Sequence, residues 1–129
     1  MDITSWREIG TVPITVLQLE GDLVAEDPLT ARARAAFADG ARNFVLDLGD
    51  VPYISSAGLR AIHTIYLLLR DADPSEKPTA AGIASGSYKS PHLKLVKPSK
   101  NALKALSTAG YDMFLDIHDS LTAAVASFT

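Results

Sequence analysis

The chain has 129 residues, of which 47% are hydrophobic and 21% charged, and it contains no cysteine. This length suits one domain with a real core, and the missing cysteines exclude disulfides, thiolate metal sites and cysteine nucleophiles. The formal net charge of −3 argues against direct nucleic-acid binding. No apolar stretch approaches the ~18 residues of a membrane span and the first residues lack a signal-peptide pattern, so we expect a cytoplasmic protein without membrane insertion.

Strand and helix patterns alternate through the first half of the chain, in the order strand 3–7, strand 14–19, helix 29–39, strand 43–48 and helix 57–70. Asp27 is a candidate N-cap, with Pro28 at the first helical position, and Gly40 is placed to end that helix. The 57–70 helix gives the strongest signal, because its apolar side chains share one broad face.

The second half begins with a long excursion at residues 71–92, which contains three prolines and two glycines. We expect this insertion to contribute little to the core, with one short ordered piece near residues 80–84. The elements expected after it are strand 92–96, helix 100–109, strand 113–117 and a last helix from residue 121. Candidate caps are Ser99 and then either Asp119 or Ser120. The alternation predicts a single α/β domain over residues 1–129 with a mixed or parallel sheet.

All six lysines lie between residues 77 and 104, and no acidic residue occurs from 77 to 111. One interpretation is a solvated basic edge on an otherwise acidic domain. The other is a docking patch for an acidic partner or a phosphate.

Two hydroxyls, those of Ser55 and Ser56, lie where the loop after strand 43–48 becomes the 57–70 helix. A serine at this position ordinarily caps the helix by accepting a hydrogen bond from a free N–H. The same free N–H groups and the helix dipole would also hold a phosphate well, beside Asp50. Phosphorylation of Ser56 would add about −1.5 to −2 charges there, which could switch off the docking of a partner with little change in fold.

The helical phase places Arg60, His63, Thr64 and Leu67 on the outer side of the 57–70 helix, where Leu67 is apolar without a core to fill. We therefore expect these four residues to form a docking surface. An enzyme is not expected, because no nucleophile elbow surrounds the serines and Asp47 more simply binds loop N–H groups. Tyr53 and Trp6 are read as packing residues.

The histidines of the chain, at positions 63, 92 and 118, show no ligand-like spacing. We therefore expect no metal site and no cofactor.

Residues 45–51 and 53–60, with the sequences VLDLGDV and YISSAGLR, resemble the central strand end and serine loop of the STAS domain family. Within that family they are most similar to the anti-sigma-factor antagonists. Weaker matches are the Gly-Asp-Leu at 21–23 and the Ala-Gly-Tyr at 109–111. The resemblance implies a mixed sheet with helices packed mainly on one face.

The resemblance also implies regulation by partner switching. The unphosphorylated protein would bind an anti-sigma factor that is also a serine kinase, phosphorylation at Ser56 (alternatively Ser55) would release it, and a phosphatase would reset it. The residues expected to bind the partner combine the loop and the outer helix side: Asp50, Ser55, Ser56, Gly58, Arg60, His63, Thr64 and Leu67.

Two other functions stay open. The chain could be a STAS subunit of another assembly, such as a lipid-transport or stress-signalling complex. It could also be a sensor of a small ligand or nucleotide, with Lys94, Lys97 and Lys100 near a phosphate.

Overall fold

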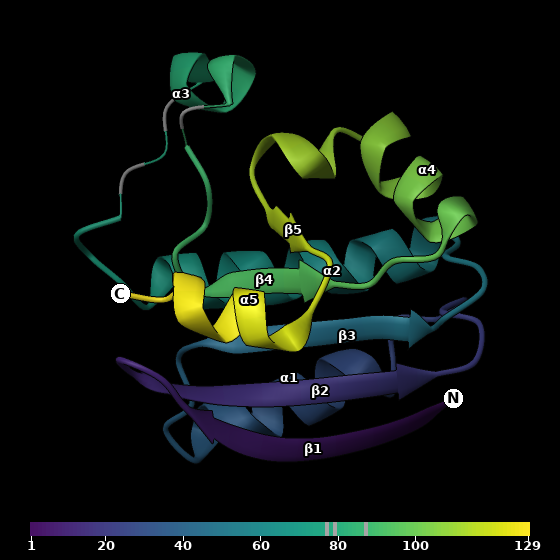
Figure 1. Ribbon diagram of the computed structural model, residues 1–129, viewed down its shortest axis with the longest axis horizontal. Helices are drawn as coiled ribbons and strands as arrows, with labels where there is room; N and C mark the ends of the chain where they lie inside the picture. Colours follow the sequence, from purple (N-terminus) through teal and green to yellow (C-terminus); the bar gives the residue numbers. More distant parts are fainter. Residues whose placement is uncertain (77, 79, 87) are drawn as a thin grey trace.

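Five strands form one mixed sheet in the computed structural model, which describes residues 1–76, 78, 80–86 and 88–129 (Figure 1). The strands are β1 (Asp2–Ile9), β2 (Pro13–Glu20), β3 (Phe44–Asp50), β4 (Leu93–Val96) and β5 (Asp116–His118). They lie side by side in chain order, with β1 antiparallel to β2 and every later pair parallel. The predicted mixed sheet is therefore confirmed.

In the described part of the chain, four α-helices and one short 3-10 helix lie between these strands, and a fifth α-helix follows the last strand. They are α1 (Leu29–Ala38), α2 (Ser56–Asp71), α3 (Ala80–Ser85), α4 (Lys100–Thr108), η1 (Tyr111–Met113) and α5 (Leu121–Ser127). The predicted strand 113–117 is wrong at its start, because the chain turns at Gly110 with a φ of 81° and forms η1 first. As predicted, Ser99 caps α4, and Ser120 rather than Asp119 caps α5.

The start of α1 also differs from the prediction. Pro28 itself occupies the cap position, and no side chain caps the helix. The Asp27 carboxylate instead accepts a hydrogen bond from the Thr30 hydroxyl. Gly40 follows the helix with a φ of 105°, as expected for the residue that ends it.

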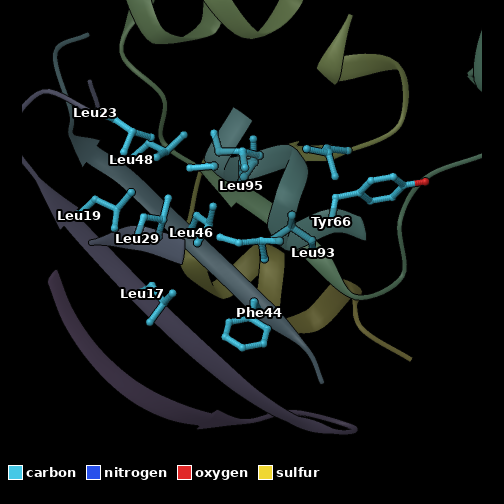
Figure 2. Packing of buried hydrophobic residues seen from close by; sticks show 14 of the residues in the cluster. Leu17, Leu19, Leu23, Leu29, Phe44, Leu46, Leu48, Tyr66, Leu93 and Leu95 are labelled. Atoms are coloured by element: carbon cyan, nitrogen blue, oxygen red, sulfur yellow. The ribbon is translucent and has the colours of Figure 1, made fainter. Parts of the chain in front are cut away.

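Alternating side chains of the strands feed two apolar clusters on opposite faces of the sheet. The larger cluster joins the helices α1, α2 and α4 to one face (Figure 2), and its strand residues are Leu17, Leu19, Phe44, Leu46, Leu48, Leu93 and Leu95. The smaller cluster packs Ala124 of α5, and Phe128 just after that helix, on Val16, Val45 and Val96 of the other face. Helices thus lie mainly on one face, as predicted, and α5 is the one helix among those contributing to these two clusters that packs on the opposite face (Figure 1).

The 71–92 excursion does contain the short ordered piece expected of it, which is α3. Its second half, however, contributes to the core, contrary to the prediction. Tyr88 packs against the larger cluster, and the buried Ser90 donates its N–H to the carbonyl of Phe114 at 2.8 Å. The prediction rested on the absence of a periodic apolar pattern in this segment. Single side chains can anchor a segment to the core without such a pattern.

The basic stretch is not one solvated edge. Lys94 is only 5% exposed, its Nζ lies 3.1 Å from the Asp116 carboxylate, and it faces the ring of Phe128 at 5.0 Å. Lys97 pairs with Asp47 at 3.5 Å. The phosphate site suggested for Lys94, Lys97 and Lys100 therefore lacks its first member. Lys77 lies outside the described residues.

No helix in the described part of the chain combines the length and the apolar character that crossing a bilayer requires.

Candidate functional site

The loop before α2 is held in place by backbone hydrogen bonds to a neighbouring segment. The N–H of Leu23 donates to the carbonyl of Tyr53, and the N–H of Ser55 donates back to the carbonyl of Leu23, both at 2.9 Å. Val51 and Ile54 bury their side chains in the larger cluster. The first turn of α2 is therefore fixed relative to the carboxyl end of β3.

The two serines at the start of α2 have different environments. Ser55 is the N-cap, and its Oγ accepts a hydrogen bond from the N–H of Gly58 at 3.2 Å. Ser56 is the first helical residue, and its side chain is exposed. Since the hydroxyl of Ser55 is engaged and half-buried, Ser56 presents the more accessible hydroxyl to another protein.

This difference predicts opposite stability effects for two matched variants. Ser55→Ala removes the cap and should lower the free energy of unfolding by about 0.5–2 kcal/mol. Ser56→Ala removes an exposed hydroxyl from a helix and should change it by no more than about 0.5 kcal/mol. Urea denaturation of both variants checks this. Equal losses in the two variants would show that Ser55 is not the cap.

Gly58 lies in the first turn of α2 and is buried. A Cβ atom at this position would come within 2.3 Å of the carbonyl oxygen of Leu23 and 2.8 Å of its Cγ. Only glycine permits so close an approach of helix and loop. The expectation that Gly58 belongs to the docking surface is therefore wrong, because its role is to pack.

A groove opens beside Ser56, between the start of α2 and the side of α4. Its volume is about 610 Å³. Its walls are formed by Tyr53, Ile54, Ser56 and Leu59 on one side and by Asn101, Lys104, Ala105, Thr108 and Ala109 on the other. The lining combines a mostly apolar floor with one cation, which suits a protein segment that carries an apolar and an acidic side chain.

The docking surface that the sequence predicts on the serine loop and the outer side of α2 contains no residue of α4, and Tyr53 is predicted to be a packing residue. The reading of Tyr53 is wrong, because the side chain is 51% exposed and lines the groove. Trp6, in contrast, packs against the smaller cluster as predicted. Position next to the serine loop was the one sequence signal for Tyr53, whereas nothing local linked Lys104 to Ser56.

The outer side of α2 is less open than its helical phase predicts. Leu67 is half-buried and packs against the larger cluster, so it does have a core to fill. The ring of His63 lies about 6 Å from those of Tyr66, Tyr111 and Phe114. η1 and its flanking residues therefore cover this side of α2.

The remaining predicted residues divide between surface and structure. Arg60 is exposed and lies 3.7 Å from the Glu26 carboxylate, while Thr64 is half-buried. Asp50 is exposed at the end of β3. Asp47 is buried and accepts a hydrogen bond from the N–H of Gly49 at 2.9 Å, which confirms its structural role.

Comparison with known proteins identifies the family to which this fold belongs. A family model described as the STAS domain matches residues 6–73, which is more than half of the chain. The chain therefore belongs to the STAS domain family. No curated protein matches its sequence.

Solved structures share the fold along most of the chain. An anti-sigma factor antagonist from Mycobacterium paratuberculosis is 20% identical, with 98% of this chain and 93% of that one covered and a TM-score of 0.66. A candidate anti-sigma factor antagonist from Thermotoga maritima is 21% identical, with coverages of 86% and 83% and a TM-score of 0.61. The anti-sigma factor antagonist SpoIIAA in its unphosphorylated form is 14% identical, with coverages of 94% and 93% and a TM-score of 0.56. The predicted fold class is thus confirmed.

Proposed function

We propose that this STAS protein is an anti-sigma-factor antagonist whose partner, an anti-sigma factor with serine kinase activity, docks on the groove beside Ser56. The observation that carries the proposal is the exposed Ser56 hydroxyl at the rim of that groove, on a helix N-terminus whose cap is the separate residue Ser55. Two solved relatives in fold, from Mycobacterium paratuberculosis and SpoIIAA, are named as proteins of this function.

The chemistry of the site suits a reversible phosphate. The first turn of a helix has N–H groups without intrahelical partners and a partial positive charge, so it tolerates an added anion. Phosphorylated Ser56 would place about −1.5 to −2 charges at the rim of a groove that also contains Lys104. The phosphate would then take the place of the partner's acidic side chain and occupy the mouth of the groove. Release would follow without unfolding, and a phosphatase would restore binding.

The proposed partner surface contains fewer residues than the one that the sequence predicts on the serine loop and the outer side of α2. It centres on the groove walls, where Tyr53 and Leu59 supply apolar area and Lys104 supplies charge. Aromatic residues are enriched among the residues that dominate binding energy at interfaces, so we expect Tyr53 to be a major contact. Asp50 and Arg60 are exposed, but neither lines the groove.

The test uses purified anti-sigma factors of the source organism. Calorimetric titration should find a one-to-one complex with one of them, and complex formation should free its sigma factor. Incubation of that complex with ATP should add one phosphate, which mass spectrometry should map to Ser56. Absence of binding to every anti-sigma factor would overturn the proposal, and phosphate on another residue would overturn the assignment of Ser56.

A further inference from the structure

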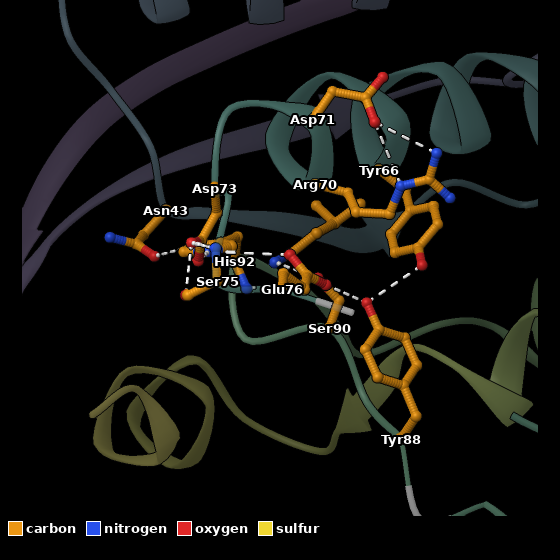
Figure 3. A network of polar contacts seen from close by, with 11 residues as sticks. Asn43, Tyr66, Arg70, Asp71, Asp73, Ser75, Glu76, Tyr88, Ser90 and His92 are labelled. Atoms are coloured by element: carbon orange, nitrogen blue, oxygen red, sulfur yellow. Dashed lines mark hydrogen bonds and ion pairs between the residues drawn. The ribbon is translucent and has the colours of Figure 1, made fainter. Parts of the chain in front are cut away.

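Three potential metal ligands converge at the end of α2 that lies away from Ser56. Asp73 and Glu76 follow the helix, and His92 directly precedes β4 (Figure 3). One ligand atom from each lies within 4.8 Å of the other two. The Nε2 atom of His92 is 2.7 Å from Oδ2 of Asp73 and 3.9 Å from Oε2 of Glu76.

Each of the two carboxylates accepts hydrogen bonds from Ser75 or Tyr88 on one oxygen and faces Nε2 of His92 with the other. The hydroxyl and N–H of Ser75 donate to Oδ1 of Asp73 at 2.6 and 2.9 Å. These hydrogen bonds, with one from His92, lower the pKa of Asp73 to about 2. The Tyr88 hydroxyl donates to Oε1 of Glu76, and burial together with this hydrogen bond raises the pKa of Tyr88.

The inner oxygen of Glu76 lacks a hydrogen bond. The Glu76 side chain is 4% exposed, and its Oε2 has no hydrogen-bond partner among the described residues. A buried carboxylate oxygen without a partner is costly, since it has lost water and gained nothing. Its position, aimed at Nε2 of His92, calls for a positive charge between them.

The imidazole of His92 is oriented by a second contact. Its Nδ1 lies 2.9 Å from the amide oxygen Oδ1 of Asn43, which can only accept a hydrogen bond. This contact fixes the plane of the ring and leaves Nε2 facing the carboxylate oxygens of Asp73 and Glu76.

We propose that Asp73, Glu76 and His92 bind a divalent transition-metal ion, for which zinc is the best match. Zinc bonds of ~2.0–2.2 Å in a tetrahedron place neighbouring ligand atoms about 3.4 Å apart. The distances from Nε2 to the two carboxylate oxygens, 2.7 and 3.9 Å, bracket that value. The imidazole nitrogen favours zinc over magnesium or calcium. Asn43 then orients the histidine as a metal's outer partner does.

The site connects parts of the chain that the sequence keeps apart. His92 is 19 residues from Asp73, so ligand spacing did not reveal it and the sequence predicts no metal site. A bound ion would fix the start of the 71–92 excursion to the residue before β4. The site is also independent of the proposed docking groove, because α2 has 16 residues and spans about 24 Å.

Calorimetric titration of the full chain with zinc chloride, after removal of metal by a chelator, tests the proposal. We expect one ion per chain and a higher melting temperature with zinc. His92→Gln and Glu76→Gln should each raise the dissociation constant at least about 10-fold, and Asn43→Ala should raise it by about 10–100-fold. His63→Gln is the control, because His63 lies among aromatic rings elsewhere on α2 and should bind zinc like the wild type.

Cobalt serves as a second probe that needs no variant. Cobalt added to the metal-free wild type should give the visible absorption bands of a tetrahedral site, and zinc should displace it. Glu76→Gln keeps an acceptor for Tyr88, so the fold should persist while these bands change. The proposal is wrong if the wild type binds no zinc at one-to-one stoichiometry, or if folded His92→Gln binds it as tightly. The contact of His92 with Asp73 is then an ion pair that shares a proton.

Discussion

Ser56→Asp should lower the affinity for the anti-sigma factor at least about 100-fold, which corresponds to about 2.7 kcal/mol of binding free energy. The aspartate would put a permanent charge at the rim of the groove, facing the acidic side chain expected of the partner. Like charges brought together at an interface cost several kcal/mol, so a loss of this size is expected. Calorimetric titration of the purified anti-sigma factor measures it.

The fold should not change in this variant. An acidic residue in the first turn of a helix gains about 0.3–1 kcal/mol from the helix dipole, so the melting temperature should stay equal or rise slightly. Ser56→Ala should bind within about threefold of the wild type. Ser107→Asp is the matched control, because Ser107 is an exposed serine of α4 that does not line the groove. Equal affinities for Ser56→Asp and Ser56→Ala would contradict the switch.

The sequence predicts the start of α2 to within one residue because capping is local, but it does not decide between Ser55 and Ser56 as the cap, which is Ser55. A serine hydroxyl, a free N–H three residues later and an apolar helix face all lie within a short stretch, and each leaves a readable pattern. The same holds for Ser99 and Ser120, which cap α4 and α5 as expected. Asp27 does not cap α1, because its carboxylate accepts a hydrogen bond from the Thr30 hydroxyl and not from a backbone N–H of the helix.

The second wall of the groove could not be predicted in this way. Lys104 and Ser56 line the same groove because β3 and β4 are parallel neighbours in the sheet, which brings the segments after both strands to one edge. The partial burial of Leu67 has a similar origin, since helical phase gives the side of a helix but not what packs beside it. Both features depend on pairings between distant segments, and a single sequence does not specify them.

Gly58→Ala should lower the free energy of unfolding by about 1–3 kcal/mol, the usual cost of forcing an extra group into a packed site. Inside a helix this substitution ordinarily stabilises by roughly 0.5–1 kcal/mol, so the sign itself is informative. The new methyl group would lie 2.3 Å from the carbonyl oxygen of Leu23, and backbone cannot rotate away as a flexible side chain can. Either α2 or the Leu23 segment must shift.

Such a shift would also reach the proposed docking site. The carbonyl of Leu23 accepts the N–H of Ser55, so movement there disturbs the residue that caps α2 and precedes Ser56. Urea denaturation measures the loss of stability, and the anti-sigma-factor titration measures the effect on binding. Ser56→Ala, two residues away on the exposed side, controls for a general effect of substitution in this turn. An unchanged or increased stability of Gly58→Ala would show that the helix and the Leu23 segment do not approach as closely as described, and the fixed position of Ser56 at the groove would lose its physical basis.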